Sequence, residues 1–195
     1  MEQEKDLKTL KIIGGIGSLL PFFSFFLKIG PLLGLVSSLL ILFAMKELAE
    51  ISGRREIFKN YLLYFILSLG VIAIIFLGFF GVLGVIGPGI LLGAGKKAFL
   101  SALFKGGFVL VASFIAAWIL GIVASYFLKK SFHEVASVFG VNIFEVTGWI
   151  IFLGAILVIV IIGAFLVFPL GNILMAVSFF SLPERFIQKG ENQTQ

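Results

Sequence analysis

Residues 46–58, KELAEISGRREIF, end one apolar helix pattern at Gly53 and restart another at Ile57 and Phe58. An echo follows 87 positions later, because residues 133–144 read HEVASVFGVNIF and repeat the order glutamate, apolar, alanine, any, apolar, any, glycine. The second copy has one residue fewer before its isoleucine–phenylalanine pair. Both copies lie between long apolar segments. We interpret them as two polar elbows, the first elbow and the second elbow, that join membrane helices.

The composition predicts an all-α fold, a polytopic transmembrane helical bundle that forms one membrane domain over residues 1–195. Hydrophobic residues make up 60% of the chain, charged residues 13%, and the mean hydropathy is +1.18, which lies outside the range of soluble domains. The absence of cysteine excludes a disulfide framework and thiolate chemistry. The net charge of +5 fits basic residues that flank helices and meet anionic lipid headgroups better than it fits nucleic acid.

The number of spans follows from length. Lys28 is the only charge between Lys11 and Lys46, and one helix over those residues would be about 50 Å long, against a hydrocarbon core of about 30 Å. The chain must therefore turn near Gly30 and Pro31. The same argument divides the later apolar runs. We expect about six spans, at residues 10–27, 30–49, 59–81, 98–128, 146–163 and 165–182.

Three segments outside these spans have their own expected structure. Ser131 and Glu134 form a capping-box pattern that predicts a short interfacial helix over residues 131–139. Residues 81–95 are apolar but rich in glycine, which predicts an outer loop, with a re-entrant loop as the alternative. The tail over residues 186–195 is polar and is expected to be disordered.

Basic residues predict the orientation: a cell-membrane protein, multi-pass, with both termini cytoplasmic. Six spans place the two elbows on the cytoplasmic side, as the positive-inside rule requires. The inner side then holds eleven basic residues and the outer side four: Lys5, Lys8, Lys11, Lys46, Arg54, Arg55, Lys59, Lys129, Lys130, Arg185 and Lys189 inside, Lys28, Lys96, Lys97 and Lys105 outside. Two spans separate the copies of the elbow, so we expect a parallel internal repeat, with Gly53 and Gly140 in the left-handed conformation.

Helix packing is expected to use small residues. In the fourth span these fall at steps of seven, four, four and three, which puts them on one helical face: Gly106, Ser113, Ala117, Gly121 and Ala124. Such a face lets two membrane helices approach closely.

Two intramembrane polar residues, Lys105 and Asn172, are the only candidate site residues within the spans. We interpret Lys105 as a lysine that snorkels to the outer surface and Asn172 as an interhelical hydrogen bond, with a substrate ligand as the alternative for Lys105. His133 is followed by a glutamate, but a helical zinc site needs a second histidine where the chain has Ser137. The sequence therefore predicts no catalytic residue, no metal site and no cofactor.

The chain resembles a family of small archaeal and bacterial integral membrane proteins that is classed only as a domain of unknown function. The resemblance rests on Leu10, Lys11, residues 14–20, Gly30, residues 33–36, 57–58, 60–62 and 177–184. It implies a multi-pass membrane protein and carries no activity over to this chain.

Two classes of function remain from the sequence. The first is a non-enzymatic structural or interaction protein that contacts the lipid bilayer, anionic headgroups at the inner face, and either a second copy or another membrane protein. The alternative is a small-solute transporter or channel subunit, suggested by the internal repeat. A membrane enzyme would require Lys105, Glu145 or Asn172 to meet in a wet pocket.

Overall fold

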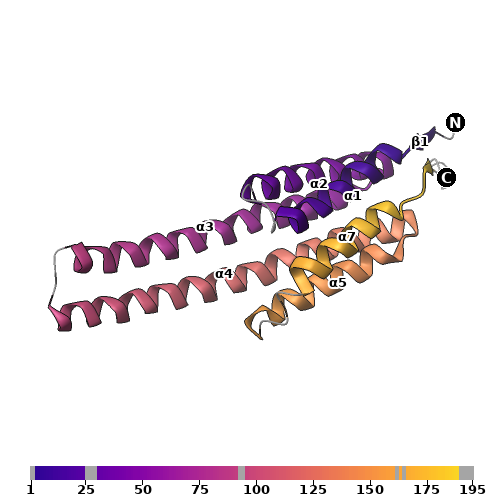
Figure 1. Ribbon diagram of the computed structural model, residues 1–195. Coiled ribbons are helices and arrows are strands. Elements are labelled where there is room, and N and C mark those ends of the chain that lie inside the picture. Colours follow the sequence, from indigo (N-terminus) through magenta and orange to yellow (C-terminus); the bar gives the residue numbers. More distant parts are fainter. Residues whose placement is uncertain (1–2, 25–29, 92–94, 161–162, 164–165, 189–195) are drawn as a thin grey trace. The chain divides into compact units, whose positions relative to one another are not determined.

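The computed structural model describes residues 3–24, 30–91, 95–160, 163 and 166–188 (Figure 1). The chain forms two compact units. The terminal unit comprises Met1–Phe65 and Ser125–Gln195, and the hairpin unit comprises Ile66–Ala124.

The described chain is helical apart from two short strands, which confirms the all-α class. The elements in order are β1 (Gln3–Asp6), α1 (Lys8–Ser24), α2 (Gly30–Ser52), α3 (Arg55–Leu91), α4 (Lys96–Phe139), α5 (Asn142–Leu157), the 3-10 turn η1 (Val158–Val160), the π-helical turn η2 (Leu166–Leu170), α7 (Gly171–Phe180) and β2 (Arg185–Gln188). Helices α3 and α4 have residues in both units.

The terminal unit is built from helices that run back and forth. Helix α1 packs against α2 and α7, and α5 packs against α7. The hydroxyl of Thr147, near the start of α5, lies 2.9 Å from that of Ser178, near the end of α7, so these two helices are antiparallel. The segments predicted as the fifth and sixth spans thus contain two separate helices, both shorter than the two stretches of membrane-spanning length in the described chain. The expected dividing point near Gly163 falls beside residues 161–162 and 164–165, which lie outside the described residues.

The buried core of the terminal unit lies next to the elbows, at the ends of the helices that they join. Three aromatic rings at its centre are fully buried: Phe132 of α4, Phe144 of α5 and Phe179 of α7. Phe144 lies edge-on to both of the others, with ring centroids 5.3 Å apart in each pair, the arrangement that aromatic quadrupoles prefer. The first helix reaches the same cluster, because Gly14 has no side chain and its backbone lies directly against the Phe179 ring.

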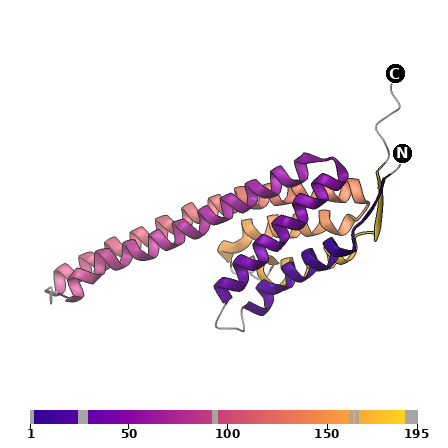
Figure 2. The same ribbon diagram turned by 90° about the horizontal axis from the view of Figure 1, so that it is seen from above.

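The two strands join the chain's ends. β1 and β2 pair antiparallel, from Gln3 opposite Gln188 to Asp6 opposite Arg185, and the backbone N–H of Leu7 donates to the carbonyl of Glu184 at 2.9 Å. Figure 2 shows both strands and both elbows at one end of the terminal unit. The predicted disorder is therefore wrong for residues 186–188, which have a strand partner that the sequence pattern did not reveal, and residues 189–195 lie outside the described chain.

Two expected interruptions of helices are absent from the structure. Helix α3 continues through the glycine-rich segment to Leu91, and α4 is continuous through residues 131–139 instead of ending before a separate interfacial helix. In apolar surroundings a helix satisfies its own backbone polar groups, whereas an irregular loop leaves them without partners. The free energy gained from these hydrogen bonds outweighs the lower helix propensity of each glycine. Ser131 is not a helix cap, because its hydroxyl donates to the Ile57 carbonyl of α3 at 2.7 Å.

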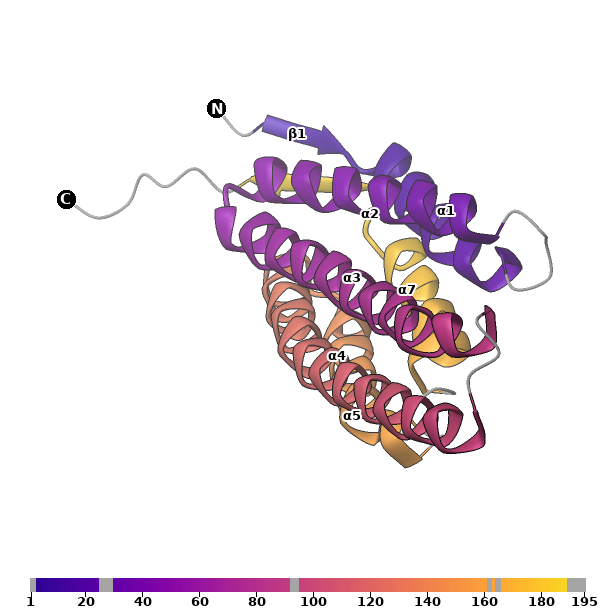
Figure 3. The same cartoon turned by 90° about the vertical axis from the view of Figure 1, so that its left-hand side faces the viewer.

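The hairpin unit consists of α3 and α4 side by side (Figure 3). The register is constant: Gly70 faces Leu120, Gly78 faces Ser113, and Gly106 faces Ile86 and Val82. Residue numbers rise on one helix as they fall on the other, so the pair is antiparallel. A Cβ atom on Gly78 would collide with Ser113. The contacts confirm that the small-residue face of α4 approaches another helix.

Candidate functional site

Both elbows contain a glycine in the left-handed region. Gly53 has φ of 70° and Gly140 has φ of 69°, a conformation that costs other residues about 1–2 kcal/mol. The N–H of Gly140 donates to the carbonyl of Ala136 at 2.9 Å and closes the last turn of α4. The prediction that these glycines end their helices in this conformation is confirmed.

The two elbows match residue for residue at a constant spacing of 87. The N–H of Ile57 donates to the Arg54 carbonyl at 3.1 Å, and the N–H of Phe144 donates to the Val141 carbonyl at 3.1 Å. Ile57 and Phe144 are both fully buried. The sequence comparison paired Ile57 with Ile143, and the structure corrects this by one residue. The side chain that enters the core is the one four residues after the glycine in each elbow, because helical periodicity and not residue type sets its direction.

The same spacing pairs two buried polar residues, Asn60 of α3 and Thr147 of α5. Thr147 has partners: its hydroxyl contacts the Ile143 carbonyl at 2.7 Å and the Ser178 hydroxyl at 2.9 Å. Asn60 is only 3% exposed, and its amide nitrogen has no hydrogen-bond partner within the described chain. Burying an unpaired amide costs about 1–3 kcal/mol. Asn60 was not predicted as a buried polar residue, because it directly follows Lys59 at the polar start of an apolar run.

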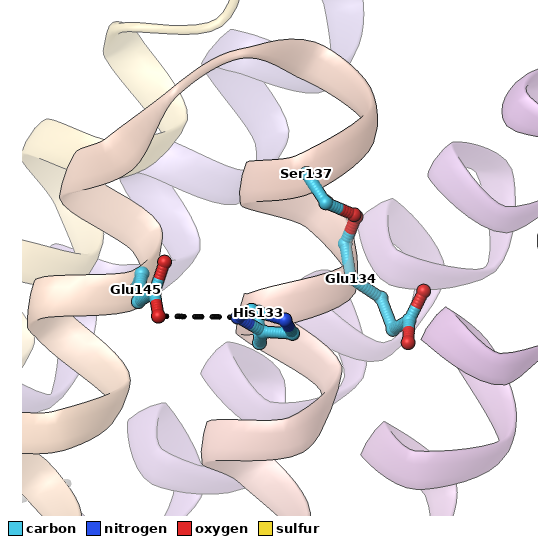
Figure 4. A network of polar contacts seen from close by, with 4 residues as sticks. All are labelled: His133, Glu134, Ser137 and Glu145. Carbon is cyan, nitrogen blue, oxygen red and sulfur yellow. Dashed lines mark hydrogen bonds and ion pairs between the residues drawn. The ribbon is translucent and has the colours of Figure 1, made fainter.

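The exposed surface of the second elbow carries a close contact between a histidine and a glutamate. The Nδ1 atom of His133 lies 3.1 Å from Oε1 of Glu145, which connects the end of α4 to the first turn of α5 (Figure 4). Glu134 points away from this pair, and the Ser137 hydroxyl donates to the Glu134 backbone carbonyl at 2.9 Å. Both paired side chains are about half exposed. The contact therefore links α4 to α5 across the elbow and is accessible to solvent. The described part of the chain contains no group of three metal-binding side chains.

One turn before His133, a lysine and three aromatic rings form a cluster between α4 and α5. The ammonium of Lys129 lies 3.1 Å from the centroid of the Trp149 ring and 5.3 Å from that of Phe152. Phe152 also has edge contacts with Tyr126 and Trp149. Tyr126 and Trp149 are each more than two-fifths exposed. Such a mixture of amphipathic rings and a snorkelling lysine is typical of the boundary between lipid hydrocarbon and headgroups.

The polar residues proposed from sequence belong to different units of the chain. Lys105 is exposed on α4 in the hairpin unit, while Asn172 is partly buried in the first turn of α7 in the terminal unit. Within the terminal unit, Asn172 precedes Ser178 by six residues and Glu145 precedes Thr147 by two. Because α5 and α7 are antiparallel, Asn172 and Glu145 lie on opposite sides of the Thr147–Ser178 contact, about 12 Å apart along the helices. The geometry gives no support to the enzyme hypothesis.

Two stretches of the described chain, Arg55–Gly87 and Leu100–Phe139, are long and apolar enough to cross a membrane, and few of their residues are buried. The fold thus defines an all-helical protein with two helices of membrane-spanning length and composition.

Residues 33–180 match the family described as "Protein of unknown function (DUF996)", so the chain belongs to that family. This confirms the resemblance inferred from the sequence. The chain is 33% identical to the uncharacterized protein MJ1644 of Methanocaldococcus jannaschii over 194 aligned residues. The alignment covers 96% of this chain and 98% of the relative. No solved structure matches the chain.

Proposed function

We propose that this protein is a non-enzymatic, multi-pass membrane protein that acts as a structural or interaction component of the cell membrane. The observation that carries this proposal is the exposed apolar surface of the hairpin unit. Its outward side chains include Phe76, Leu77, Phe79, Phe80, Phe104, Phe108, Val111 and Ile119, each more than half exposed. A helix pair whose outward surface is mostly apolar is more stable in lipid than in water.

The proposed topology has six spans, both termini in the cytoplasm and a parallel repeat. Its support is the pair of equivalent elbows, which lie at the same end of the terminal unit as the paired strands (Figure 2). An even number of crossings separates segments that lie on one side of a membrane. The basic residues of both elbows then face the cytoplasm, and anionic headgroups at the inner face are their natural partners.

Cysteine labelling tests this topology, because the native chain has no cysteine. Ser52→Cys and Ser137→Cys should react with a membrane-impermeant thiol reagent only when the cytoplasmic face is opened. Ser52 is partly buried and Ser137 is exposed, so the second should react faster. Ser101→Cys, exposed on α4, is the matched outer control and should react in intact cells. Reaction of the two elbows from opposite sides would refute the six-span arrangement.

A transporter or channel subunit is the second candidate, favoured by the buried Asn60 amide nitrogen that has no partner in the described chain. A solute or ion-bound water could accept its hydrogen bond during passage. Proteoliposomes should be screened for solute flux with the native protein, Asn60→Leu and Asn172→Leu. Flux that disappears in Asn60→Leu, with the protein still folded, would favour transport. Absence of flux with the native protein across the screened solutes would favour the structural role.

A further inference from the structure

One face at the start of α4 combines charge and exposed aromatic surface. Lys97, Ser101, Phe104, Lys105 and Phe108 follow one another at steps of four, three, one and three, which places all five on one side of the helix. All five are exposed, Phe104 by 81% and Phe108 by 75%. The helix turns its opposite side, at Gly106, toward Ile86 of α3. We call these five residues the basic–aromatic face.

Neither water nor hydrocarbon suits this face as a whole. In water, the two phenylalanine rings would remain almost fully hydrated, which disfavours that setting. In the hydrocarbon core, the two lysines would lose their hydration with no carboxylate of the hairpin unit to pair with, because residues 66–124 contain no aspartate or glutamate. The boundary between headgroups and acyl chains satisfies both kinds of side chain, since rings enter the acyl region while ammonium groups reach phosphates.

We propose that the basic–aromatic face lies in the headgroup layer of the outer leaflet and binds the phosphate groups of anionic lipids through Lys97 and Lys105. This inference rests on the proposed membrane function. Charge complementarity selects the occupant: all charges of the hairpin unit are lysines, at positions 96, 97 and 105. A second copy docked on the same face would bring like charges together, which disfavours it.

The helix lengths support the same placement. The charge-free part of α4 from Gly106 to Leu128 is about 35 Å long, enough to cross the hydrocarbon core alone. The ten residues before it, from Lys96 to Lys105, belong to the same helix and are not needed for crossing. This extra length is about 15 Å, which reaches into the headgroup layer, and a tilt of the helix keeps it closer to the membrane surface.

The depth of the face can be measured directly with a spin label. In vesicles that contain an anionic phospholipid, a label on Ser101→Cys should report the phosphate level, while one on Ala116→Cys, also exposed on α4, should report the hydrocarbon core. A label at position 101 with the accessibility of bulk water, or with the depth found at position 116, overturns the proposal. Carbonate extraction of the same vesicles tests membrane integration separately: release of the protein would refute the proposed function itself.

The phosphate contact requires a second measurement. In the Ser101→Cys background, label mobility is recorded as the anionic lipid fraction is raised. The anionic lipid fraction that gives half of the full change in label mobility should rise about tenfold or more in Lys97→Gln/Lys105→Gln. The reason is that each lysine near an anionic surface contributes roughly a fivefold preference. Lys59→Gln/Lys130→Gln is the matched control with the same net charge and should respond like the native protein. Lys97→Arg/Lys105→Arg should restore the response. Equal responses of the two glutamine variants overturn the proposal.

Discussion

Packing of α1 against α7 depends on the absence of a side chain at Gly14. A methyl group in Gly14→Ala would overlap the Cδ1, Cε1 and Cγ atoms of Phe179. That ring cannot move aside, because it is fully buried and held edge-on by Phe144 at 5.3 Å. The two helices must therefore separate, and overpacking of this kind costs about 1–3 kcal/mol. The better helix propensity of alanine offsets about 0.5–1 kcal/mol of that cost.

Gly34→Ala is the matched control, because a Cβ atom there meets nothing within 4 Å. It retains only the propensity gain, which both variants share, so the two should differ in unfolding free energy by the overpacking cost of about 1–3 kcal/mol. The assay is titration of the purified protein with sodium dodecyl sulfate in mixed micelles, followed by circular dichroism. Phe179→Leu should make Gly14→Ala less costly by about 1 kcal/mol in a double-mutant cycle, since a smaller side chain can yield. A difference between Gly14→Ala and Gly34→Ala below about 0.5 kcal/mol would refute the close packing.

Three further results are expected. Gly140→Ala should cost about 1–2 kcal/mol in the same titration from backbone strain alone, whereas Gly107→Ala, inside a helix and unobstructed, should be neutral or stabilising; equal effects would contradict the left-handed turn. Thr147→Val and Ser178→Ala should each lower the unfolding free energy by about 1 kcal/mol, and the double variant should show a coupling energy of about 0.6 kcal/mol. Strictly additive effects would argue against contact between the two hydroxyls. Lys129→Gln should shift the fluorescence of the indole beneath its ammonium and cost less than about 1 kcal/mol; an unchanged emission spectrum would contradict the cation–π contact.

The elbows could be predicted from the sequence because their cause is local. Gly53 and Gly140 each follow a helical pattern, and a left-handed residue at the end of a helix is most often glycine. The continuity of α4 could not be predicted in this way. Lys129, Lys130 and Ser131 are compatible with either a helix interior or a new start, and the contact that decides between them is with Ile57, which is 74 residues away in the chain. Strand pairing between the termini is a contact between even more distant residues.

Candidate site residues were harder to predict than helices, since their state depends on neighbours from other segments. Lys105 has the exposure expected of a snorkelling lysine. Asn60 and Thr147 both lie near the start of an apolar helix, shortly after a charged residue, and nothing local distinguishes them. Only packing gives Thr147 the hydroxyl of Ser178 as a partner and leaves the Asn60 amide nitrogen without one.

This difference between Asn60 and Thr147 identifies where the two halves of the chain diverge. Each elbow places an apolar anchor four residues after its glycine and a buried polar residue seven residues after it. In the second half, the Ser178 hydroxyl of α7 pairs with the Thr147 hydroxyl and offsets the cost of its burial. In the first half, the helix that follows α3 is α4, and its Ser131 hydroxyl donates to the Ile57 carbonyl, three residues before Asn60, and not to the Asn60 side chain. The Asn60 amide nitrogen is therefore the buried polar group that lacks an acceptor in the described chain, and a bound water or ligand at this point would remove its desolvation cost.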